Sequence, residues 1–165
     1  MKLTDKLRQL WASHPKGQTA VSPQPDRANV PSPIRPRVLI VHHNPTISFD
    51  GGRKLHEVLH WQDPHALAQQ YMADVEAASY GYVNYQIVEC VEADEFPVKA
   101  DGFRYDAESY LFRWRSRTGF HHPDQLDYGR FLQQHNIPAR INANQIDEVW
   151  MFGFPYAGYY ESVMV

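Results

Sequence analysis

The sequence predicts an α/β fold, with a small and mainly parallel sheet flanked by helices. Compact runs rich in valine, isoleucine and aromatic side chains at residues 37–41, 82–91 and 148–152 are typical of strands. The segments between these runs space their apolar side chains as helices do. Because helical connections between neighbouring strands make those strands parallel, we expect right-handed crossovers within one sheet.

Composition favours one ordinary globular core. The chain has 165 residues, of which 43% are hydrophobic. Its formal net charge of -3 argues against nucleic-acid binding. Cys90 is the only cysteine and is interpreted as a buried structural thiol. No run approaches the roughly 18 apolar residues of a membrane helix and none has signal-peptide character, so a cytoplasmic protein without a membrane partner is predicted.

Three segments organise the chain. Residues 1–14 place leucines and a tryptophan on one side, which predicts an amphipathic helix. Residues 15–36 contain six of the twelve prolines and are interpreted as a linker. The α/β domain is expected over residues 37–165. Since three strands make a thin sheet and the chain stops in an apolar run, we expect a larger domain, of which a further portion or a partner completes the sheet.

The first half of the domain contains one strand and two helices. The first strand ends in His42-His43-Asn44-Pro45, and a short helix is predicted over residues 53–61. Asp63 and Pro64 indicate the start of the next helix, because Asp caps its amino end and Pro suits the first helical position; Gly81 ends it. Its predicted buried stripe consists of Leu67, Tyr71, Met72, Val75 and Ala78.

The second half contains two strands and three helices. Asp106 and Asp127 are the expected N-terminal caps of two of these helices. The last strand is closed by Gly153. The predicted helices span residues 107–117, 127–136 and 139–145.

Residues 56–60, His-Glu-Val-Leu-His, match the H-E-x-x-H pattern of zinc peptidases. Residues four apart on a helix share a face, so His56 and His60 would hold one zinc ion. Glu57 would activate the bound water as a general base. Zinc needs a third protein ligand, and the sequence leaves several candidates. They are His65, Glu76 on the following helix, His121 or His122 in a loop with Asp124, and His42 or His43 after the first strand.

A second candidate site follows from the rule that open α/β sheets bind ligands beyond the carboxyl ends of their strands. One such segment carries His42, His43 and Asn44, and the other is the aromatic loop at residues 153–162. The short helix follows the first segment closely, so we expect both candidates to form one site. In the aromatic loop, Tyr156, Tyr159 or Tyr160 would stabilise a developing oxyanion, and Tyr160 and Glu161 would contact substrate.

Three other sequence patterns give weaker indications of function. The first strand is not followed by a glycine-rich loop, so no nucleotide cofactor is expected. Ser162 lacks the G-x-S-x-G turn of serine hydrolases. Residues 113–117, Arg-Trp-Arg-Ser-Arg, are basic and aromatic, and they are interpreted as a solvated helix face because Arg113 and Arg117 share one side.

Residues 94–103 read Asp-Glu-Phe-Pro-Val-Lys-Ala-Asp-Gly-Phe, and residues 146–152 read Ile-Asp-Glu-Val-Trp-Met-Phe. Pro155-Tyr156 and Tyr160-Glu161-Ser162 follow them. Together these segments resemble a family of uncharacterised, mostly bacterial proteins, over about residues 37–165. The resemblance implies that this chain is a truncated copy of a larger domain, and it brings no established activity.

The sequence thus favours a metal-assisted hydrolase that uses zinc at the HEVLH segment and acts on a small molecule or peptide. The alternative is a non-catalytic α/β module that binds a glycan or a protein through its C-terminal aromatics, or a fragment without autonomous function. Three protein ligands around one open metal position would favour the hydrolase. Imidazoles of His56 and His60 that point apart or into solvent would favour the binding module.

Overall fold

A computed structural model describes residues 31–160 of the chain. Almost all of this part belongs to one compact unit that begins at Pro33. The helix predicted over residues 1–14, most of the linker, and Glu161 with Ser162 lie outside the described residues.

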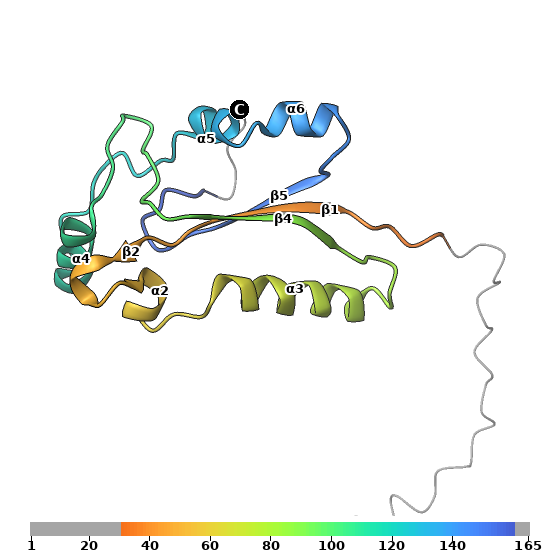
Figure 1. Ribbon diagram of the computed structural model, residues 1–165, viewed down its shortest axis with the longest axis horizontal. Helices are drawn as coiled ribbons and strands as arrows, with labels where there is room; N and C mark the ends of the chain where they lie inside the picture. Colours follow the sequence, from red (N-terminus) through yellow and green to blue (C-terminus); the bar gives the residue numbers. More distant parts are fainter. Residues whose placement is uncertain (1–30, 161–165) are drawn as a thin grey trace, which may run out of the picture. The chain divides into compact units, whose positions relative to one another are not determined.

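The main sheet consists of three parallel strands in the order β4–β1–β5 (Figure 1). The central strand β1 spans Arg37–His43, and it pairs with β4 at Gln86–Ala93 and β5 at Glu148–Phe152. Residues 38–41 of β1 are at most 1% exposed, because the strand has a neighbour on each side and helices over both faces. The predicted α/β class and its small, mainly parallel sheet are confirmed.

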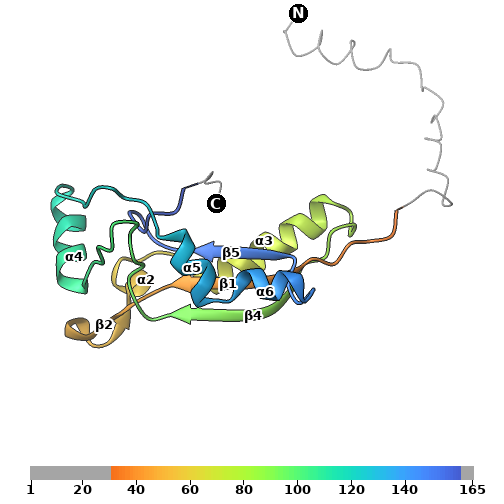
Figure 2. The same ribbon diagram turned by 90° about the horizontal axis from the view of Figure 1, so that it is seen from above.

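Helices form a layer on each side of this sheet (Figures 1 and 2). Helix α3, Pro64–Ala78, lies along one face, whereas α5 at Tyr128–Gln134 and α6 at Ile137–Asn142 cover the other. Helix α4, Ala107–Ser116, and the single turn α2, Leu55–Val58, stand at the carboxyl ends of the strands. The helices predicted in the second half of the chain therefore exist, and their first and last residues differ from the prediction by at most three positions.

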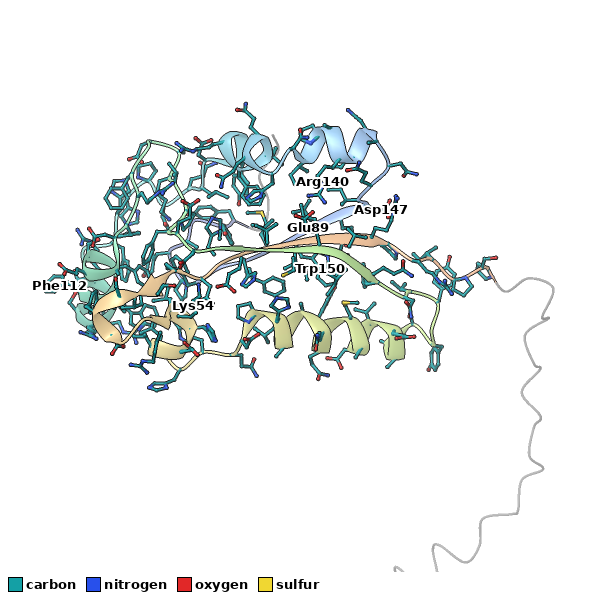
Figure 3. The ribbon with its side chains drawn as sticks, viewed as in Figure 1. Lys54, Glu89, Phe112, Arg140, Asp147 and Trp150 are labelled. Atoms are coloured by element: carbon teal, nitrogen blue, oxygen red, sulfur yellow. The ribbon has the colours of Figure 1, made fainter. Side chains whose placement is uncertain are left out.

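Side chains of the central strand alternate between the two layers, as strand geometry requires. Val38 and Ile40 pack with Ala68 of α3, and Trp150 of β5 lies in the same layer (Figure 3). Leu39 and Val41 pack with residues of α5 and α6 on the opposite face. The alternation continues to the end of the strand, and it sends two consecutive histidines to opposite faces of the sheet.

The short helix predicted over residues 53–61 is wrong at both ends. An antiparallel ladder pairs β2, Thr46–Ile47, with β3, Arg53–Lys54, through a 3-10 turn at Ser48–Asp50. This hairpin was not predicted, and it holds two residues of the expected helix in a strand. At the other end, His60 has a φ of 56°, which is a left-handed conformation that an α-helix does not contain.

Two further expectations are corrected. Only Ala68 of α3 is fully buried, whereas Leu67 and Tyr71 of the predicted stripe are 39% and 52% exposed. The narrow three-stranded sheet covers only part of this helix. The second strand begins at Gln86 rather than at residue 82, because Val83 makes only an isolated bridge with Ile34. Within residues 31–160, no helix is both long and apolar enough to cross a membrane.

Candidate functional site

A cavity of about 480 Å³ opens at the carboxyl ends of β1 and β5. Its walls come from the end of β1, from α2 and the following loop, from the first turns of α3, and from the segment after β5. The lining residues are His43, Asn44, Leu55, His56, His60, Trp61, Gln62, Pro64, Leu67, Phe152, Gly153, Phe154 and Pro155. Most of this surface is apolar, and the polar groups belong chiefly to histidines and amides.

Tyr159 holds the imidazole ring of His43 in place. The tyrosine hydroxyl forms a hydrogen bond with Nδ1 of His43, and the two ring centroids lie 6.0 Å apart. Burial lowers the pKa of His43 to about 4, so its imidazole is neutral at pH 7. Burial also raises the pKa of Tyr159, which keeps the phenol protonated. A phenol that donates to Nδ1 would leave the imidazole proton on Nε2, whereas an Nδ1–H that donates to the phenol oxygen would leave Nε2 as an acceptor.

His56 is held between two polar side chains. Its Nδ1 lies 2.9 Å from the side-chain amide nitrogen of Asn44, and its backbone N–H donates to Oδ1 of the same side chain at 3.3 Å. Its Nε2 lies 3.8 Å from a carboxylate oxygen of Asp63. Asp63 also accepts a hydrogen bond from the backbone N–H of Ala66 and so caps α3. Both ring nitrogens of His56 therefore face protein groups.

The other two HEVLH residues differ in their positions. His60 lines the same cavity as His56 and is exposed, but it follows the end of α2 and does not share a helix face with His56. Glu57 accepts a hydrogen bond from the backbone N–H of Lys54 at 2.7 Å. This contact caps the amino end of α2, so the carboxylate expected to act as a base serves a structural role.

Two of the candidate third ligands, Glu76 and His121, do not join these histidines. Glu76 accepts from the Asn84 amide at 2.8 Å near the far end of α3. His121 lies 2.7 Å from Asp101 through Nε2, and its ring stacks on Phe103 at 3.8 Å. Within the described residues, no three ligand atoms of the predicted set lie within 4.8 Å of one another. That set was His56, His60, Glu76 and His121.

The tyrosines of the loop after β5 do not line the cavity. The ring of Tyr156 stacks on Phe120 at a centroid distance of 3.5 Å, and its carbonyl accepts from Nζ of Lys99 at 2.5 Å. The backbone N–H of Tyr160 donates to the hydroxyl of Tyr128 at 2.9 Å. Of the three tyrosines, only Tyr159 acts near the cavity, through its bond to His43.

His42 joins a different group of residues. It lies on the face of the sheet that α3 covers, where its ring is 5.2 Å from that of His65. One ligand atom each from His42, His65 and Cys90 fall within 4.8 Å of one another. The sequence offers His65 and His42 as candidate ligands and predicts Cys90 as a structural thiol. The pairing of β1 with β4 brings His42 and Cys90 together, and no spacing in the sequence indicates this pairing.

No protein-family model, curated protein sequence or solved structure matches this chain. The resemblance to uncharacterised bacterial proteins therefore stays a prediction.

Proposed function

We propose that the protein binds a small organic molecule in the carboxyl-edge cavity and hydrolyses it. The observation that carries this proposal is the convergence of His43, His56, His60 and Asn44 on one otherwise apolar cavity. Its volume of about 480 Å³ falls among small-molecule sites, which span roughly 300–1,000 Å³. The cavity also occupies the carboxyl edge, where open α/β sheets bind their ligands.

The walls favour a ligand with an apolar body and an acceptor oxygen. Trp61, Leu67 and Phe154 supply apolar surface. We assign the proton of His43 to Nε2, with the Tyr159 hydroxyl donating to Nδ1, so that Nε2–H would donate a hydrogen bond toward such an oxygen. An ester or amide carbonyl meets both requirements, because it joins apolar groups through an oxygen that gains charge during hydrolysis.

Water is the nucleophile that fits this cavity. Its described lining residues include no serine, threonine, cysteine, aspartate or glutamate, so none of them offers the usual covalent nucleophile. We assign the general base to His60, whose exposed imidazole is accessible to water. Since the amide nitrogen of Asn44 lies 2.9 Å from Nδ1 of His56, we assign His56 to positioning rather than to a metal.

Non-catalytic binding of a small molecule is the second candidate, and the apolar character of the walls favours it. It shares the cavity with the hydrolase and lacks only the water-activating role of His60. The two functions therefore predict the same ligand site and differ in turnover.

Both candidate functions are tested by measuring ligand binding and hydrolysis on the same set of variants. Binding of aryl esters and amides is followed by nuclear magnetic resonance, and their cleavage by product release. Leu67→Trp fills the cavity without removing a histidine, so we expect it to abolish binding. His60→Ala should keep binding and lower hydrolysis by about 10²–10⁴-fold. His122→Ala, at an exposed histidine that does not line the cavity, is the matched control.

The outcomes separate the candidates. Binding and turnover that respond in this way support the hydrolase. Binding that Leu67→Trp abolishes, without any turnover in the wild type, leaves the binding module. Binding that Leu67→Trp does not change contradicts both functions, because the ligand then lies elsewhere.

A further inference from the structure

We propose that His42, His65 and Cys90 form a zinc-binding site on the face of the sheet that α3 covers. This site is distinct from the HEVLH segment, and it does not depend on the proposed hydrolysis. Two imidazoles and one thiolate leave a fourth tetrahedral position open, as in zinc sites that bind water.

The three residues come from three elements that the fold holds together. Ile40 pairs with Cys90 in the parallel ladder of β1 and β4, so His42, two residues further along β1, shares a sheet face with Cys90. His65 is the second residue of α3, whose cap at Asp63 fixes the start of the helix. Each ligand thus stands on regular secondary structure, which favours a preorganised site.

The three ligand atoms lie near one another, as a shared metal site requires. One ligand atom from each residue lies within 4.8 Å of the other two, and Sγ of Cys90 is 3.2 Å from Nε2 of His65. Zinc–sulfur and zinc–nitrogen bonds at tetrahedral angles place ligand atoms roughly 3.3–3.6 Å apart. Rotamer adjustment of His65, which is exposed, can bring its ring into this range.

His42 gives independent support for a ligand. It is 2% exposed, and neither of its ring nitrogens has a hydrogen-bond partner among the described residues. An unsatisfied buried polar group costs about 1–3 kcal/mol, so native proteins rarely leave one without a partner. A metal ion at this position would satisfy one nitrogen. The nearest charged group to Nε2 is a carboxylate oxygen of Glu92 at 3.9 Å, too far for a hydrogen bond.

The chemistry of the three ligand atoms favours zinc over other common metal ions. Two imidazoles and a thiolate suit zinc, whereas magnesium and calcium prefer oxygen ligands. Glu92 pairs with Lys54 at 2.5 Å, so its carboxylate is engaged beside the site rather than within it. Binding converts the Cys90 thiol to a thiolate and releases its proton to solvent. The open position would then hold water or a ligand group.

Titration of the metal-stripped protein with Co²⁺ and Zn²⁺ tests this site. Co²⁺ bound to a thiolate gives a sulfur-to-metal absorption band that imidazole and carboxylate ligands do not produce. We expect one equivalent of metal and this band in the wild type. Cys90→Ser should lose the band, and His65→Ala should weaken binding by at least about tenfold, since even the loss of an outer partner costs 10–100-fold. His65 is exposed, so its variant tests the site without disturbing the core.

His60→Ala is the matched control, because it removes a histidine of HEVLH and leaves the proposed ligands intact. It should bind metal as the wild type does, even where it abolishes hydrolysis, which separates the two proposals. Circular dichroism confirms that each variant is folded. The zinc site is overturned if the wild type shows no thiolate band, if Cys90→Ser and His65→Ala bind as tightly as the wild type, or if His60→Ala loses the metal instead.

Discussion

Nζ of Lys99, whose side chain is completely buried, lies 2.5 Å from Oδ1 of Asp124 and 2.5 Å from the carbonyl oxygen of Tyr156. This ammonium joins the loop before α5 to the loop after β5, two segments that are distant in the sequence. Gly158 lies against the same group, since a Cβ there would be 2.9 Å from Nζ. The lysine therefore anchors the segment after β5. This segment carries Pro155, which lines the cavity, and Tyr159, which forms a hydrogen bond with His43.

Lys99→Met should lower the free energy of unfolding by about 3–5 kcal/mol, because it leaves the Asp124 carboxylate and the Tyr156 carbonyl without their cation. Urea denaturation measures the change. Arg115→Met, which removes an exposed positive charge, is the matched control and should stay within about 0.5 kcal/mol of wild type. Replacing Lys99 by Met and Asp124 by Leu together should restore most of the loss. A Lys99→Met variant as stable as the wild type would contradict this role of the ion pair.

Gly153→Ala should destabilise the protein by about 1–3 kcal/mol, because the added methyl would lie 2.6 Å from Cε2 of Tyr159. The displaced ring would also lose its hydrogen bond to His43. Gly129→Ala is the control. Gly129 lies in α5, and an added Cβ there would meet no atom closer than 3.5 Å. In a helix, that change should stabilise by about 0.5–1 kcal/mol. Thermal unfolding distinguishes the two, and equal shifts in both variants would refute the steric argument.

The sequence predicted the layers of this fold from local signals. The β-branched run of residues 37–41 became the buried central strand, and the caps at Asp63, Asp106 and Asp127 each accept the expected hydrogen bond from a helical N–H. Such patterns are local because hydrophobic alternation and capping involve residues a few positions apart. They predicted α3, α4 and α5 well, since each helix starts immediately after its capping residue.

The candidate site was harder to predict because it depends on tertiary contacts. The HEVLH prediction assumed a continuous helix, but the hairpin of β2 and β3 and the left-handed His60 restrict α2 to one turn. The cluster of His42, His65 and Cys90 depends on the register between β1 and β4, which no spacing in the sequence gives. The cavity lies at the carboxyl edge of the sheet, where the rule for open α/β folds led us to expect a ligand site.

Asp147 should make the protein sensitive to strong acid. Hydrogen bonds from the side chain and backbone N–H of Arg37 lower the pKa of Asp147 to about 2. In the unfolded chain an aspartate titrates near pH 3.9, so the carboxylate stabilises the fold above about pH 4 and loses this effect as the pH falls toward 2. Urea denaturation from pH 7 to pH 2 measures this loss.

In Asp147→Asn, the part of the free energy of unfolding that depends on pH through this carboxylate should be absent. The stabilities of the variant and the wild type should therefore converge at pH 2. The same substitution at Asp74, an exposed aspartate of α3, is the control and should leave the slope of stability against pH unchanged. A wild-type slope that persists in Asp147→Asn would show that another group is responsible.

Asp63 should stabilise α3 chiefly as a cap rather than as a charge. Its Oδ1 accepts from the N–H of Ala66 at 3.0 Å, and this bond is the largest cause that lowers the pKa of Asp63. Asp63→Ala should therefore cost about 1 kcal/mol in urea denaturation. Asp63→Asn keeps an oxygen at the same place and should cost only a few tenths. Because the first turn of α3 carries His65, Asp63→Ala should also weaken Co²⁺ binding while Asp63→Asn does not; equal losses in both would assign the effect to charge.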